Sequence, residues 1–195
     1  MLDLHWWSVY GRFVNCRSLF SLPVLSREAV FLVDGRGSSA VGLPSIGGLC
    51  YSRKEFFSCE VPERFEKVAV HVVEALALIV AVRLWVPQLP SQSVIPVGSD
   101  NQSVIAAVNL GKPRDKNLAA LARLVWGVFA VRGSTCHLRY VPSKENMSDG
   151  VSRLNVGHVD YLIQKGWLRL RPKEYLFSLD DDDHFLCQEG TQRLG

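Results

Sequence analysis

The stretch Val70–Val82, VHVVEALALIVAV, is an almost wholly apolar run that carries one carboxylate, Glu74. A run of this length and composition predicts a helix that is buried in a protein core. A lone buried carboxylate is costly unless it is paired, binds a metal ion or reaches water. The rest of the sequence should therefore supply a partner, a metal or an exit to water for Glu74.

The apolar run continues from Val68 to Val86, which is close to the roughly 20 residues that span a bilayer. It contains Glu74 and Arg83, however, and charged side chains are costly inside a membrane. Pro87 and Pro90 then end it. We therefore expect a buried helix of a folded domain and no membrane partner.

The composition is that of a globular chain, with 195 residues of which 48% are hydrophobic and 21% charged. The formal net charge is +3, and without the acidic run Asp180–Asp183 the remaining 22 basic and 15 acidic side chains give +7. A mildly basic body permits a polyanionic partner without requiring one. The five cysteines are scattered without a C-x-x-C pair, and no secretion signal opens the chain. We therefore expect an intracellular protein, cytoplasmic or nuclear.

The hydrophobic periodicity predicts an α/β fold with a mixed five-stranded sheet and helices on both faces. Three short antiparallel strands are followed by parallel ones, and the expected strands span residues 28–34, 45–51, 55–61, 93–98 and 136–141. The expected helices span residues 62–85, 102–110, 117–132 and 148–154. We divide the chain into a connector (1–27), a domain (28–155) and a C-terminal extension (156–195) whose acidic run is typical of a disordered tail. Whether this extension packs onto the domain stays open.

Four carboxylates fall at the ends of predicted strands or on helices that pack against the sheet, namely Asp34, Glu74, Asp100 and Asp149. If they meet in one place, like charges would raise their pKa values. Two Mg²⁺ ions, or Mn²⁺, would neutralise them through hard oxygen ligands. Two such ions about 3.5–4 Å apart form the clamp used in phosphoryl displacement. A metal site would explain why Glu74 lies in an apolar helix.

Four segments around these acids resemble the ribonuclease H family: VFLVDG, VVEALAL, VGSDNQSVIAAVN and VPSKENMSDGVSRL. The last two are most similar to the ribonuclease H domains of DIRS-type and gypsy-type retrotransposons. The early stretch DLHWWSVYGRF resembles the segment that joins reverse transcriptase to ribonuclease H in DIRS-type elements. The resemblance covers roughly residues 3–155. It implies a ribonuclease H-like fold, metal-dependent hydrolysis of the RNA strand of RNA–DNA hybrids, and a reverse transcriptase segment as a possible partner.

The resemblance also implies roles for individual residues. Asp34 would bridge both metal ions, Glu74 and Asp100 would hold the ion near the scissile phosphate, and Asp149 would hold the second ion. Five further residues are candidates for substrate contacts: Asn101 and Gln102 at a helix N-terminus, Asn146, and Arg36 and Arg153, which are equally well explained as surface charge.

Each acid also has an ordinary explanation. Asp100 and Asn101 suit a helix cap, Asp149 suits a first helical turn, and Glu74 could pair with Arg83. The chain also departs from the family pattern after its first acid and lacks a histidine between His137 and Asp149. Concentrated basic charge in this region is confined to Lys112–Lys116.

Two alternative functions therefore stay open. One is a catalytically decayed or domesticated remnant that only binds nucleic acid or protein. The other is another nuclease of the same fold, such as an integrase or exonuclease, although the segment NMSDGVSRL argues against it.

Overall fold

The computed structural model describes residues 30–38, 42–114, 116–178 and 191–193. The expected connector at residues 1–27 and the acidic run at 180–183 lie outside these residues. The strands are β1 (Phe31–Arg36), β2 (Ser45–Cys50), β3 (Glu55–Glu60), β4 (Val94–Ser99), β5 (Thr135–Tyr140), β6 (Leu168–Pro172) and β7 (Thr191–Arg193). The helices are α2 (Val70–Trp85), α3 (Gln102–Leu110), α4 (Lys116–Val131), α5 (Ser148–Ser152) and α6 (Val156–Gln164), with 3₁₀ turns η1 (Glu63–Phe65), η2 (Val86–Gln88) and η3 (Glu174–Phe177).

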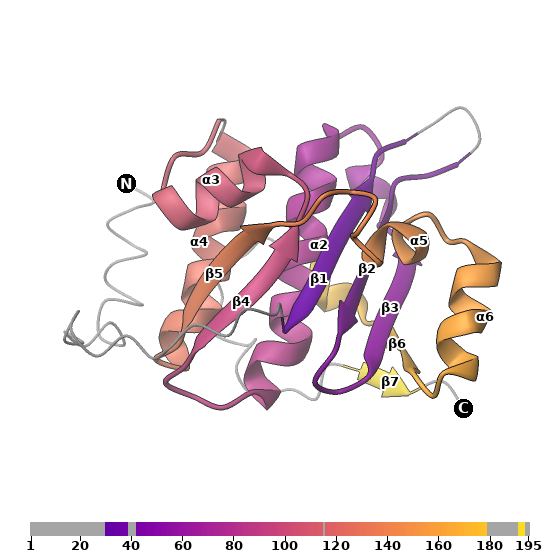
Figure 1. Ribbon diagram of the computed structural model, residues 1–195. Helices are drawn as coiled ribbons and strands as arrows, with labels where there is room; N and C mark the ends of the chain where they lie inside the picture. Colours follow the sequence, from indigo (N-terminus) through magenta and orange to yellow (C-terminus); the bar gives the residue numbers. More distant parts are fainter. Residues whose placement is uncertain (1–29, 39–41, 115, 179–190, 194–195) are drawn as a thin grey trace.

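The strands form one mixed sheet in the order β5-β4-β1-β2-β3-β6-β7 (Figure 1). The first three strands are an antiparallel meander, and β4 and β5 extend it in parallel, as expected. Parallel pairing requires a crossover connection, and the helices between β3 and β5 supply it. The predicted mixed α/β sheet is confirmed, and over the described residues it has seven strands, two more than the five expected.

The two additional strands come from the segment that the sequence left as an extension. β6 pairs in parallel with β3, with Arg169 opposite Phe56, and β7 pairs with β6. The motif LRLRP of β6 is short and basic, so it carried too weak an apolar pattern to be recognised as a strand. Residues 156–178 therefore pack onto the domain.

The expected single helix over 62–85 is also wrong in its first turns. Residues Glu63–Phe65 form a separate 3₁₀ turn, and the chain is extended at Ala69 before α2 begins at Val70. Phe65 is buried in the core, so this turn has its own anchor apart from α2.

Helices cover both faces of the sheet, as expected (Figure 1). One large apolar core joins α2, α3 and α4 to the first face. A smaller core on the opposite face joins α5 and α6 to β2 and β3; its members are Leu49, Phe56, Val151, Val159 and Leu162. Because strand side chains alternate between faces, β2 and β3 contribute to both cores.

The apolar helix α2 is the centre of the larger core. In the described part of the chain, Val70–Gln88 is the one helical segment long and apolar enough to cross a membrane, and 78% of its apolar window is buried inside the structure. Arg83, at its far end, donates hydrogen bonds to the carbonyl oxygens of Leu176 and Ser178 at 2.8 and 2.6 Å. The burial is that of a core helix, and Arg83 anchors the C-terminal segment to it.

Candidate active site

Asp34 lies within β1, two residues before its end, and Asp100 directly follows the neighbouring parallel strand β4. Leu32 of β1 pairs with Gly98 of β4, so two residues further along Asp34 is level with Asp100. Asp34 is only 7% exposed, and the hydroxyl of Ser152 donates a hydrogen bond to its Oδ2. Burial raises the pKa of Asp34, the Ser152 hydrogen bond opposes this, and the charges of Asp100 and Asp149 raise it further.

Glu74 approaches the same end of β1 from the opposite face of the sheet. The backbone of α2 packs directly on Gly35, where a Cβ atom would lie 2.6 Å from the Glu74 nitrogen. Burial raises the pKa of Glu74 to about 8; a hydrogen bond with Asn101 lowers it, and the charges of Asp100 and Asp34 raise it. The Oε2 atom of Glu74 is buried and has no hydrogen-bond partner. The hydrogen bond with Asn101 therefore offsets only part of the free-energy cost of burying this carboxylate.

Asn101 connects the start of α3 to the carboxylates. Its Oδ1 accepts hydrogen bonds from the backbone nitrogens of Ser103 and Val104 at 2.8 and 3.1 Å, which caps the helix as predicted. The same side chain makes the hydrogen bond to Glu74. Gln102 opens the helix and is exposed. Asn101 can therefore cap α3 and belong to the carboxylate cluster at the same time.

Asp100 and Asp149 each have a partner from a nearby loop or helix. The Ser143 hydroxyl donates to Asp100 Oδ2 at 2.6 Å. Directly after α5, Arg153 Nε lies 2.8 Å from both Oδ1 and Oδ2 of Asp149. Arg153 also interacts electrostatically with Asp34 and Asp100, and its hydrogen bond with Asp149 is the main reason why the pKa of Arg153 is raised.

Buried hydroxyl groups hold α5 against the sheet. Ser45 Oγ donates to the carbonyl oxygen of Ser152, and Ser58 Oγ donates to that of Val151, each at 2.6 Å. Gly47 permits the close approach, because a Cβ atom there would lie 2.5 Å from the Ser152 nitrogen. These contacts satisfy the last carbonyl groups of a helix too short to be stable alone, and they fix the position of Asp149.

Asn146, expected to contact substrate, is 3% exposed. Its Nδ2 donates to the carbonyl oxygen of Val33 at 3.2 Å, and its Oδ1 accepts from the backbone nitrogen and hydroxyl of Ser148. This arrangement favours a role in joining α5 to β1 over direct contact with a substrate. Arg36 ends β1 two residues beyond Asp34, so strand alternation places it on the same face.

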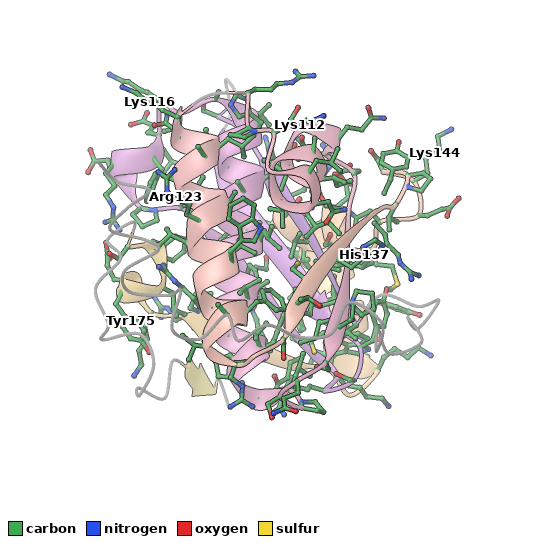
Figure 2. The ribbon with its side chains drawn as sticks, turned by 90° about the vertical axis from the view of Figure 1, so that its left-hand side faces the viewer. Lys112, Lys116, Arg123, His137, Lys144 and Tyr175 are labelled. Carbon is green, nitrogen blue, oxygen red and sulfur yellow. The ribbon has the colours of Figure 1, made fainter. Side chains whose placement is uncertain are left out.

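Basic side chains lie near the end of the domain where α4 begins. Figure 2 shows Lys112 and Lys116 at that end of α4, Lys144 toward the same end, and Arg123 midway along the helix. The charge is spread over the loop 111–114, α4 and the loop after β5. It does not form one dense basic helix.

Neither a family model nor a curated protein matches the sequence. Among solved structures, ribonuclease H1 from the halophilic archaeon Halobacterium salinarum NRC-1 is 15% identical, with a TM-score of 0.50 over 67% of this chain and 96% of that protein. LC11-RNase H1, isolated from compost by a metagenomic approach, is also 15% identical, with a TM-score of 0.50 over 66% of this chain and 95% of that protein. The fold is ribonuclease H-like. At this identity the likeness concerns the fold alone.

The carboxylates that this ribonuclease H-like fold brings together suit a hard divalent cation chemically, and the partnerless Glu74 Oε2 is available as a ligand. Their side chains are not arranged as a ready ligand set, however. Among the described residues, no three His, Cys, Asp or Glu side chains are close enough to hold one metal ion. Asp34, Asp100 and Asp149 each turn toward a hydrogen-bond donor of the protein. Metal binding would require these side chains to exchange partners.

Proposed function

We propose that this chain is a metal-dependent endonuclease that hydrolyses the RNA strand of RNA–DNA hybrids. The observation that carries the proposal is the repulsion between carboxyl groups from β1, α2, α5 and the end of β4: Asp100 and Asp149 act on Asp34, and Asp34 and Asp100 act on Glu74. A cluster of this kind, with one partnerless buried oxygen, is typical of a site that binds cations. The ribonuclease H-like fold supports the same assignment.

In this proposal Asp34, Glu74, Asp100 and Asp149 hold two Mg²⁺ ions, or Mn²⁺. The ions would supply positive charge and Lewis acidity at the scissile phosphate. The exposed N-terminus of α3 at Gln102 would bind a backbone phosphate, since helix N-termini favour anions. Asn101 would hold Glu74 in place through the hydrogen bond that it already makes.

The motifs around Asp100 and Asp149 support the further proposal that the domain belongs to a retroelement polyprotein of DIRS or gypsy type. Its substrate would then be the hybrid formed during reverse transcription, and a reverse transcriptase segment would be its partner. An intracellular location, cytoplasmic or nuclear, is part of the same proposal.

The test is a cleavage assay with the full chain and a hybrid whose RNA strand carries a fluorophore, in Mg²⁺, in Mn²⁺ and in EDTA. We expect metal-dependent RNA cleavage by the wild type, and loss of cleavage to background in Asp100→Asn. Asp160→Asn is the matched control, because this exposed acid lies on α6 and takes no part in the cluster. Equal cleavage by wild type and Asp100→Asn would contradict the proposal.

One observation favours the alternative of a decayed or domesticated remnant that only binds nucleic acid or protein. The charges of the described carboxylates act on one another, but no three of these side chains are placed to hold one metal ion. A chain that binds hybrid and leaves the RNA intact in both metals would support this alternative. Cleavage of duplex DNA with the hybrid spared would instead indicate another nuclease of the same fold.

A further inference from the structure

Asp149 differs from the other acids of the cluster in the nature of its partner. Asp34 and Asp100 each accept a hydrogen bond from a serine hydroxyl at one oxygen, Oδ2. Asp149 has both carboxylate oxygens within 2.8 Å of one cationic nitrogen, Arg153 Nε. The shared N–H takes up part of the acceptor capacity of Asp149, and a metal ion that approaches these two oxygens meets a positive charge already placed there.

The pair is held loosely enough to exchange. The side chains of Arg153 and Asp149 are 60% and 33% exposed, and Arg153 follows the short helix α5 four residues after Asp149. Exposed pairs of this kind contribute little to stability, because water screens the charges and both side chains lose freedom. The Arg153 charge also acts on Asp34 and Asp100, so it offsets part of the repulsion that a metal ion would otherwise remove.

We propose that Arg153 and a divalent cation compete for the carboxylate of Asp149. Arg153 is then a positioning residue that sets the metal affinity of the site and leaves Asp149 when a metal binds. This inference rests on the proposed function, since it assumes that the carboxylates bind metal. The displaced guanidinium keeps its donors and is free for a substrate phosphate.

The test is calorimetric titration of the full chain with Mn²⁺, without any nucleic acid. We expect Arg153→Gln to bind Mn²⁺ about two- to fivefold more tightly than the wild type, the range that an exposed ion pair would cost a competitor. Arg153→Lys, which keeps the charge but loses the planar guanidinium, should lie between them. Arg64→Gln is the matched control, because it removes the same charge from an exposed pair with Glu174, outside the cluster. It should bind Mn²⁺ like the wild type.

A second readout follows from linkage, because a ligand stabilises the fold in proportion to its affinity. At one Mn²⁺ concentration near the wild-type dissociation constant, the rise in Tm should be larger for Arg153→Gln than for the wild type. A purely structural role for the pair would lower the Tm of the variant without enlarging this rise.

The outcomes separate the inference from the function on which it rests. Equal or weaker Mn²⁺ binding by Arg153→Gln, with binding by the wild type, overturns the competition and leaves the metal site standing. Binding by Arg153→Gln alone supports the competition in its strongest form. An absence of Mn²⁺ binding at millimolar concentration in both proteins overturns the metal site and the competition together.

Discussion

Gly35 of β1 lies against the backbone of Glu74 in α2 so closely that a Cβ atom at position 35 would be 2.6 Å from the Glu74 nitrogen and 2.7 Å from its Cα. Backbone atoms cannot yield at such a distance without moving the helix. The glycine after Asp34 thus has a packing reason, and it permits the close approach of α2 at the point where Glu74 joins the other acids.

The first prediction concerns this contact. Gly35→Ala should lower the free energy of unfolding by roughly 1–3 kcal/mol, the cost of overpacking a tight contact. It should also impair cleavage, because α2 must move and carry Glu74 with it. Urea denaturation measures the first effect. Gly37→Ala is the control: its Cβ would meet the Val70 side chain at 3.4 Å, an ordinary contact, so stability should change little. Equal losses in the two variants would contradict the packing argument.

The second prediction concerns the pH dependence that Glu74 imposes. Its pKa is raised to about 8 from an ordinary value of 4.5. Between these values the unfolded chain loses the proton while the folded chain keeps it, so the free energy of unfolding falls as the pH rises. The stability associated with this proton is complete below pH 4.5 and is lost by about pH 8.

Glu74→Gln removes this titration. With EDTA present, the variant should be more stable than the wild type by on the order of 2 kcal/mol at pH 8, after allowance for partial exposure, and equally stable near pH 4. Urea denaturation at a series of pH values provides the measurement. A stability difference that does not change with pH would count against a raised pKa for Glu74.

The third prediction separates the support of α5 from the support of a carboxylate. Ser152→Ala removes the hydroxyl that donates to Asp34, and Ser58→Ala removes one that donates to the Val151 carbonyl. Each loss leaves a buried acceptor unsatisfied and should cost about 1–3 kcal/mol of stability. Only Ser152→Ala should further raise the pKa of Asp34, and only it should tighten Mn²⁺ binding, because it frees the Oδ2 atom from a donor that a metal ion would otherwise have to displace. Equal Mn²⁺ affinities in the two variants would show that the Asp34 contact has no part in metal binding.

The fourth prediction concerns Asn146, whose amide joins the loop before α5 to Val33 of β1. Asn146→Ala should cost about 1–3 kcal/mol of stability, because a buried carbonyl group loses its donor. A direct contact with substrate would instead reduce hybrid affinity while leaving stability unchanged. Thermal unfolding and hybrid binding, measured on the same preparation, distinguish these two roles.

Short-range sequence patterns were enough to predict the helices and strands whose ends are marked by capping or turn residues. The helix predicted over 102–110 is found with these bounds, capped by Asn101 and ended by Gly111 in the left-handed conformation with φ of 62°. The antiparallel meander and the parallel strands after it also match the prediction, since apolar runs and turn residues mark them. β6 escaped prediction, because its identity depends on pairing with β3 and not on its own residues.

The amino-acid sequence alone indicates which acids follow strands or lie on packed helices, because capping, turn formation and burial depend on near neighbours. It therefore named Asp34, Glu74, Asp100 and Asp149 as one candidate set. The hydrogen-bond partners of these side chains became visible only in the folded chain. The hydroxyl of Ser152 and the packing on Gly35 come from segments distant along the chain. Such contacts depend on how helices pack on the sheet. This packing follows from the burial of the whole apolar face of each helix and of the sheet, and no single motif encodes it.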